Sequence, residues 1–306
     1  MSSGSSDNRS IPAELLQELD GRVGAVMVVF WMLFFIALNF VFFWLGKSVT
    51  SLRPLSDKRC RNLAVSWVHA CISTFGCGYS YVMYGQYLDN LGDLVDVRPY
   101  PSYLFVAISF AYFIFDMLEH KWHGTVLESW EVMAHHVAVL TTFGYNLWYQ
   151  TCIAFSEVAL LTEVNSVFLH ARKLMQMFRV PFSHWLYRII VVINLVTFVV
   201  FRGLGLSLIV VGVIKYKHKI STYYVFGLAS SMTIMIAINP VLFWRLLKSD
   251  VLRAFNKHAR KSPQKEAGKD KRDLTAVNGV NAHAMLNDHV RMTSQNEGFR
   301  KRDKTA

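Results

Sequence analysis

Seven long apolar runs, separated by short polar segments, follow one another along this chain. Each run comes close to the roughly 20 residues that a helix needs to cross the hydrocarbon core of a bilayer. No strand-length alternation of apolar and polar positions is present, and backbone exposed to lipid must satisfy its own hydrogen bonds. The pattern therefore predicts an all-α, polytopic membrane protein, whose expected membrane helices cover about residues 23–46, 63–84, 102–118, 130–149, 151–172, 186–213 and 223–247.

The composition supports a membrane protein and argues against a nucleic-acid-binding one. Of the 306 residues, 53% are hydrophobic and only 17% are charged, whereas a soluble domain is charged at about a quarter of its positions. The net charge is +11, but the basic residues lie in short loops and near the end of the chain, as cytoplasmic flanks do. We interpret residues 1–22 as a polar tail, 23–54 as the first membrane helix with its loop, and 254–306 as a disordered basic tail.

Loop charges predict how the chain is oriented. The loop at 47–61 carries five Lys or Arg residues, whereas the loop at 85–99 carries three Asp residues and one Arg. Basic loops stay on the cytoplasmic side, so we expect the N-terminus outside and the C-terminus in the cytoplasm. Lys215, Lys217 and Lys219 in the sixth loop oppose this assignment.

The adjacent pair His135–His136 lies inside the expected helix 130–149. An ionisable group at bilayer depth costs roughly 2.5–3.5 kcal/mol on insertion scales, so such residues face protein or a water-filled cavity. Successive residues differ by about 100° around a helix, so one ring can face a cavity while the other contacts a neighbouring helix. Two interpretations remain open: an imidazole that acts as base, nucleophile or hydrogen-bond donor, and a pair of helix-to-helix hydrogen bonds.

The expected helix 151–172 carries a second group of polar residues. Glu163, Ser166 and His170 share one face, and Asn165 lies beside that face. Glu157 lies about 120° away around the helix, so we expect it to meet a different partner.

Two more ionisable residues lie at membrane depth. Arg202 is central in the expected helix 186–213 and needs a carboxylate or backbone carbonyls nearby. We expect it to pair with Asp116 or with one of the two glutamates of helix 151–172. Asp116, His120 and His123 share a helical face, which permits a zinc or iron site, but solvation in a polar loop explains the two histidines without a metal. We expect no metal and no cofactor.

Several longer motifs resemble one known family. They are AYFIFD at 111–116, SWEVMAHH at 129–136, LLTEVNSVFLHAR at 160–172, LYRIIVVINLV at 186–196 and the pair Phe201–Arg202. As a set they resemble the TLC domain, a family that includes ceramide synthases, translocation-associated membrane proteins and a branch linked to membrane phospholipid composition. The resemblance implies six membrane helices around a lipid-accessible cavity, here at about 55–253, with 23–46 as an additional helix in front.

Ceramide synthases follow their His pair with a histidine and two aspartates. Here Glu163 falls on the first aspartate, while Thr162 and Ser166 replace the histidine and the second aspartate. The motifs are closer to the branch implicated in membrane fluidity, whose members limit the incorporation of long-chain polyunsaturated acyl chains into phospholipids. The resemblance therefore implies this role here, in the plasma membrane or alternatively in the endoplasmic reticulum.

We expect these residues to converge on one cavity that binds a phospholipid or an acyl chain, or acyl-CoA. The candidate catalytic residues are His135, His136 and Glu163, and the candidate binding residues are Asp116, Glu157, Asn165 and Arg202. His135 or His136 would be the reactive or hydrogen-bonding group, Glu163 would orient it, and Arg202 would supply counter-charge. Two alternatives remain: an acyltransferase that uses acyl-CoA and the His pair, and a trafficking adaptor that binds lipids or proteins without a reactive histidine.

Overall fold

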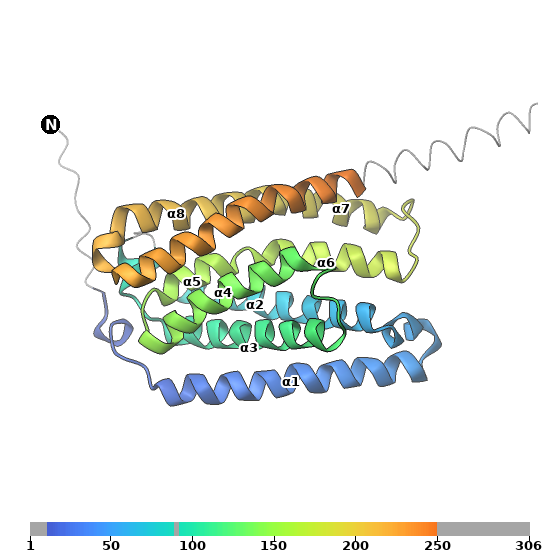
Figure 1. The fold of residues 1–306 in the computed structure, drawn as a ribbon, viewed down its shortest axis with the longest axis horizontal. Coiled ribbons are helices and arrows are strands. Elements are labelled where there is room, and N and C mark those ends of the chain that lie inside the picture. The colour runs from blue at the N-terminus through green and yellow to red at the C-terminus, as the bar shows by residue number, and fades with distance from the viewer. Residues whose placement is uncertain (1–10, 89–91, 250–306) are drawn as a thin grey trace, which may run out of the picture. The chain divides into compact units, whose positions relative to one another are not determined.

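The computed structural model of the chain describes residues 11–88 and 92–249 (Figure 1). These residues form helices and connecting turns, and no strand occurs among them. The predicted all-α, polytopic architecture is confirmed. The described residues up to 243 form one compact unit; residues 244–249 are the described part of the second unit. The predicted disordered tail at 254–306 lies outside the described residues.

Eight labelled α-helices and one further helix make up most of the described chain. The labelled helices are α1 (Gly21–Ser48), α2 (Lys58–Leu88), α3 (Tyr100–Trp122), α4 (Trp130–Tyr149), α5 (Ile153–Leu160), α6 (Glu163–Met177), α7 (Trp185–Thr197) and α8 (Gly205–Tyr216). A π-helical segment, Phe198–Leu204, joins α7 to α8, and the last described helix is Thr222–Ser249. Short 3₁₀ segments occur at Ala13–Leu15, Thr50–Ser56, Asp93–Val95 and Lys217–Lys219.

Five of the described helical spans are long and apolar enough to cross a membrane. They are Gly21–Ser48, Tyr100–Trp122, Ile153–Met177, Trp185–Lys219 and Thr222–Ser249. The other two expected membrane helices, α2 and α4, are also long but carry more polar residues, several of them buried, such as His69, Ser73 and Ser80 in α2. The count of seven membrane helices therefore stays a prediction.

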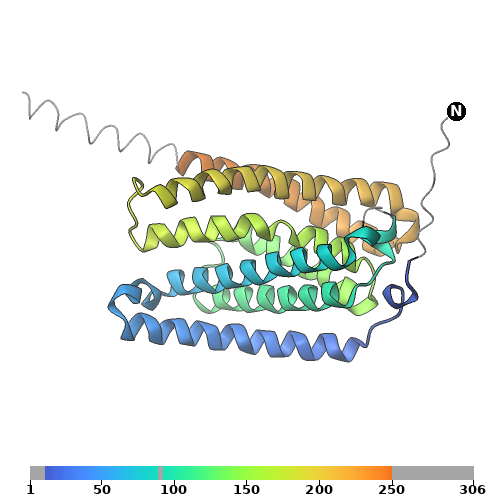
Figure 2. The ribbon, with the colours of Figure 1, turned by 180° about the vertical axis from the view of Figure 1, so that it is seen from behind.

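The helices α2 and α3 lie at the centre of the first unit. α2 packs against α6 and α3, and α3 also packs against α1 and α4. α7 packs on α6, and α8 packs on α5, so α1 and the α7–α8 pair lie on opposite sides of the central helices (Figures 1 and 2). The largest apolar core gathers around α3, with Phe35, Val106, Phe113, Phe143 and Leu160 among its buried members.

The tight turn between α4 and α5 closes one end of this unit. Gln150 and Cys152 both adopt left-handed backbone conformations, with φ of 52° and 54°. The Gln150 side chain exchanges two hydrogen bonds with the backbone of Leu19, and the Cys152 amide donates to the Val95 carbonyl at 3.1 Å. These bonds tie three loops together at the end of α4. The cavity described below lies at the other end of the unit, where α4 begins.

The structure divides two expected helices that hydropathy treats as continuous. The expected helix 151–172 is interrupted at 161–162, where the Thr162 amide donates to Ala159 at 3.1 Å and the Val164 amide to Leu161 at 3.2 Å. The Thr162 hydroxyl also donates to the Ala159 carbonyl at 2.8 Å, and such local bonds compete with regular helix. The expected helix 186–213 contains the π-helical segment.

The helix α3 continues beyond its expected end. His120 was expected in a polar loop, but it lies in the last turn of α3, and His123 forms the C-cap of that helix. The loop expectation was wrong because hydropathy marks the apolar part of a helix, whereas polar residues continue the helix past the membrane boundary.

Candidate functional site

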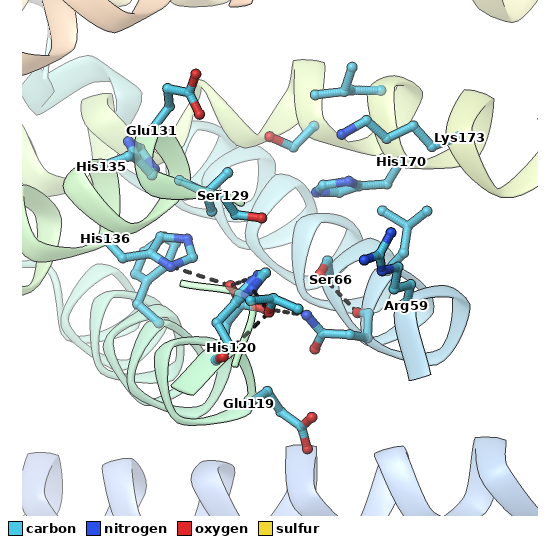
Figure 3. Close-up of a pocket in the computed structure, with 18 of the residues that line it drawn as sticks. Arg59, Ser66, Glu119, His120, Ser129, Glu131, His135, His136, His170 and Lys173 are labelled. Carbon is cyan, nitrogen blue, oxygen red and sulfur yellow. Dashed lines mark hydrogen bonds and ion pairs between the residues drawn. The ribbon is translucent and has the colours of Figure 1, made fainter. Parts of the chain in front are cut away.

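A cavity of about 640 Å³ lies where α2 and α4 begin and α3 and α6 end. Five of the seven predicted site residues line it: Asp116, His135, His136, Glu163 and Arg202. They come from α3, α4, α6 and the π-helical segment, so residues up to 86 positions apart in the sequence share one wall. Figure 3 shows the two adjacent histidines of α4 on one side of this space. These five residues therefore share one cavity, while their predicted roles in binding or catalysis stay predictions.

Asp116 forms the polar centre of one wall. Its Oδ2 lies 3.3 Å from His136 Nδ1 and 3.7 Å from His120 Nε2, and its Oδ1 accepts a hydrogen bond from Asn62 Nδ2 at 2.8 Å. The His136 contact has the distance of an ion pair but not the alignment of a hydrogen bond. Asp116 and His136 are 3% and 5% exposed. Asp116 thus links α2, α3 and α4 and holds the His136 ring in place.

The histidines of the hypothetical metal site have different partners. His120 contacts Thr125 Oγ1 through Nδ1 at 2.8 Å, and His123 Nε2 lies 3.0 Å from Glu119 Oε2. Within the described ranges, no group of three or more His, Cys, Asp or Glu side chains is arranged to hold a metal ion.

His135 lies deeper along the same face of the cavity. Its Nδ1 is 3.1 Å from Met235 Sδ in the last described helix, and its ring centroid is 5.4 Å from that of His136. Phe113 packs against both rings, at 6.0 Å and 5.0 Å between centroids. One ring was expected to face a cavity and the other a neighbouring helix; instead, both rings line the cavity and each also contacts a neighbouring helix.

A second, smaller cavity of about 50 Å³ adjoins the first. Both cavities are lined by Phe113, His135, Glu163 and Arg202, and the smaller one is otherwise mostly apolar. Val139 and Leu160 are among its buried apolar residues. The shared residues His135, Glu163 and Arg202 therefore stand where the wide cavity, which holds most of the ionisable groups, meets the narrow, mostly apolar one.

Arg202 donates to three neutral oxygens. Its Nε donates to Asn165 Oδ1 at 3.0 Å, its Nη1 to Asn239 Oδ1 at 3.2 Å, and its Nη2 to Ser166 Oγ at 3.2 Å. The expected direct pairing with a carboxylate was wrong, since no ion pair to Arg202 occurs within the described part of the chain. Glu163 lines the same cavity and interacts with Arg202 electrostatically. The amide and hydroxyl oxygens fix the guanidinium without neutralising its charge.

Asn165 lies behind Arg202 and does not line either cavity. It is fully buried, and its Nδ2 lies within hydrogen-bond distance of Asn194 O at 2.9 Å, Asn194 Oδ1 at 3.0 Å and Thr197 Oγ1 at 3.2 Å. Asn165 therefore joins α6 to α7 and acts on the site through Arg202, as a positioning residue.

Glu157 is separate from the site. It is 6% exposed and lines neither cavity. Its carboxylate accepts a hydrogen bond from Ser102 Oγ in α3, and its backbone carbonyl accepts one from Cys77 Sγ in α2. The sequence pattern had placed it on a different face from Glu163, and the structure gives it different neighbours.

Several cavity residues escaped the sequence reasoning. Glu131 lines the cavity four residues before His135, and Lys173 lines it three residues after His170. Residues three or four apart share a helical face, so this spacing was the signal that could have identified both. At the mouth, Arg59 and Glu128 form an exposed ion pair of 2.8 Å, which only the fold brings together.

Fold and site together define a polytopic helical membrane protein whose helices enclose a cavity lined by histidines, carboxylates and an arginine. Comparison with known families matches residues 59–248 to the TLC domain. The chain belongs to the TLC domain family, whose members are lipid-related membrane proteins. The match lies within the predicted domain at 55–253, whose exact bounds stay a prediction.

Named relatives support this assignment. The chain is 35% identical over 207 residues to TLC domain-containing protein 2 of Danio rerio, in an alignment that covers 67% of this chain and 82% of that protein. It is 28% identical over 198 residues to TLC domain-containing protein 1 of Homo sapiens, covering 64% of this chain and 77% of that protein. No solved structure matches the chain significantly.

Proposed function

We propose that this protein regulates membrane phospholipid composition and fluidity by binding a phospholipid or its acyl chain in the intramembrane cavity. Through this binding it limits the polyunsaturated acyl chains in membrane phospholipids, the role implied by its motif resemblance. The observation that carries the proposal is that Asp116, His135, His136, Glu163 and Arg202 line one cavity among membrane helices. Ionisable groups at membrane depth are costly to bury, so a cluster of them is a candidate functional site.

The two adjoining cavities suit an amphiphilic ligand. The larger one offers imidazole, carboxylate and guanidinium groups, and the smaller one offers mainly apolar walls. A lipid would place its ester region near His135, Glu163 and Arg202, where the two spaces meet, and its chain along the apolar side. Burial of each methylene group would contribute about 0.8 kcal/mol.

The proposed location is the plasma membrane, with the endoplasmic reticulum as the alternative. Under the positive-inside rule, the basic loop at 47–61 lies in the cytoplasm. The cavity mouth, which includes Lys58 and Arg59 in the first turn of α2, would then open toward the cytoplasmic leaflet.

The second candidate is an acyl-CoA-dependent acyltransferase. The observation that favours it is that His135 and Arg202 line both cavities, so an acyl carbonyl at their junction would contact both. An amine would attack the thioester carbonyl while the imidazole takes the proton of the amine. The C–S bond would then break, and the CoA thiolate would leave and regain a proton from the imidazolium.

The deciding experiment compares cells that express the wild-type chain or the variant His135→Ala/His136→Ala. Phospholipid acyl composition is measured by mass spectrometry, with expression and membrane localisation checked in parallel. The control is Ser230→Ala, whose exposed hydroxyl bonds only to the Phe226 carbonyl of its own helix. We expect the double variant to lose the restriction on polyunsaturated chains and the control to keep it.

An unchanged lipid profile in the well-expressed double variant would overturn the proposal and favour a trafficking adaptor. Product formation from acyl-CoA and an amine by the purified protein, lost in the double variant, would favour the acyltransferase.

A further inference from the structure

Basic groups gather on the α2 and α6 side of the cavity. In Figure 3, His170 and Lys173 of α6 and Arg59 of α2 lie on one side, while Glu131 and His135 of α4 lie on the other. His170 and Lys173 are three residues apart and share a helical face. Lys58, the first residue of α2, also lines this part of the cavity. Two lysines and a histidine therefore line the part of the cavity between the start of α2 and the second half of α6.

The acidic groups near this mouth already have partners. Asp116 contacts His136 and accepts from Asn62, Glu119 contacts His123, and Glu128 pairs with Arg59. None of these carboxylates is paired with the two lysines.

The lysine and histidine donors, by contrast, have no protein acceptor among the described residues; the two lysine side chains are exposed to solvent, whereas the histidine donor is buried. The ammonium groups of Lys58 and Lys173 have no hydrogen-bond or ion-pair partner among the residues that the structure describes. His170 Nδ1 is buried and likewise has no partner within that part of the chain. A buried polar atom without a partner costs about 1–3 kcal/mol, so an external acceptor that reaches it would be stabilised.

We propose that Lys58, His170 and Lys173 form a binding site for a phosphate group at the mouth of the cavity. Phosphate offers several acceptor oxygens, matches ammonium and imidazole donors, and lies at headgroup depth in a bilayer. The phosphate belongs either to a phospholipid headgroup or to the nucleotide part of acyl-CoA, and the inference rests on the proposed lipid-binding role of the same cavity.

The test measures equilibrium binding to the purified full-length chain in detergent. One arm compares dihexanoyl-phosphatidylcholine with dihexanoylglycerol, which lacks the phosphate. The other arm compares hexanoyl-CoA with hexanoyl-pantetheine, which lacks the CoA phosphates. Both arms are repeated with Lys58→Gln/Lys173→Gln and with His170→Ala, and thermal unfolding confirms that each variant is folded.

The matched control is Lys47→Gln, which removes one positive charge from the last turn of α1, outside the cavity. We expect one phosphate ligand to bind at least about tenfold more tightly than its phosphate-free analogue. The affinity of the double lysine variant for that phosphate ligand should fall about tenfold or more, which corresponds to the loss of one charge-assisted hydrogen bond. Lys47→Gln should not change the affinity.

Phosphate-dependent binding in the first arm would identify a phospholipid headgroup as the source of the phosphate. Phosphate-dependent binding in the second arm would identify CoA as the source, and either result supports the site. Equal binding of both members of each pair, or unchanged binding by the folded lysine variant, overturns it. Because His135→Ala/His136→Ala leaves these three donors in place, that variant should keep the phosphate dependence. A failed site and a failed lipid-regulatory function are therefore distinguishable.

Discussion

Replacing Asn165 by alanine removes the side chain that joins α6 to α7 and holds Arg202. The wild-type amide lies within hydrogen-bond distance of two oxygens of Asn194 and of the Thr197 hydroxyl, and it accepts from Arg202 Nε at 3.0 Å. The residue is fully buried, so water cannot replace these contacts directly. The variant should therefore be less stable than the wild-type protein, and Arg202 should lose one of its three anchors.

The expected magnitude follows from these contacts. Interhelical hydrogen bonds in membrane proteins contribute about 0.6 kcal/mol each on average, and an unpaired buried donor costs about 1–3 kcal/mol. Asn165→Ala should therefore lower the free energy of unfolding by about 2–4 kcal/mol. At about 2–4 °C per kcal/mol, the unfolding temperature should fall by about 4–16 °C.

The assay is thermal unfolding of the purified protein in detergent, followed with a thiol-reactive fluorescent reagent. Three buried thiols report the transition: Cys60, Cys77 and Cys152. Ser230→Ala is the control, and as a surface change it should stay within about 0.5 kcal/mol of the wild type. An Asn165→Ala variant that unfolds at the wild-type temperature would refute the positioning role.

Two further predictions test packing and the limits of the site. A methyl group added at Gly24 in α1 would overlap the Tyr103 ring in α3, so Gly24→Ala should destabilise by about 1–3 kcal/mol. Gly78→Ala, with nothing within 4 Å of the added atom, should be neutral or stabilising by up to about 1 kcal/mol in the same unfolding assay. Glu157 lies outside both cavities, so Glu157→Gln should keep the wild-type phospholipid profile, whereas Glu163→Gln should lose it. Matching profiles for these two variants would contradict the placement of the site.

Hydropathy located the helices because membrane depth dictates apolar composition. The expected helix 130–149 coincides with α4, and the expected helix 223–247 lies within Thr222–Ser249. The expected 63–84 falls short of α2, Lys58–Leu88, because its first turn carries charged residues that extend the helix past the bilayer. Helix ends at the membrane surface are therefore less visible in the sequence than helix centres.

The site was predicted in part, for a related reason. The cost of burying an ionisable group in lipid indicates that Asp116, His135, Glu163 and Arg202 face protein or water. The same cost applies to Glu157, and it does not say which of these residues share a cavity. That depends on which helices pack together. The helix α2, which supplies Lys58 to the mouth, packs on α6, although α6 begins 75 positions after α2 ends.

The two interruptions of regular helix explain why the partners of Arg202 could not be read from the sequence. Glu163 begins α6 immediately after the break at 161–162, and Arg202 lies within the π-helical segment Phe198–Leu204. A regular helix advances by about 100° per residue, so a break or a π turn changes the direction of every side chain that follows. Predictions of side-chain direction that assume a regular helix therefore fail at these positions. Irregular backbone at membrane depth is tolerated where it lies against protein or a water-filled space. Here the break borders the smaller cavity through Thr162, and the π-helical segment borders both cavities through Arg202, so the departures from regular helix that hide the site from the sequence lie at the site itself.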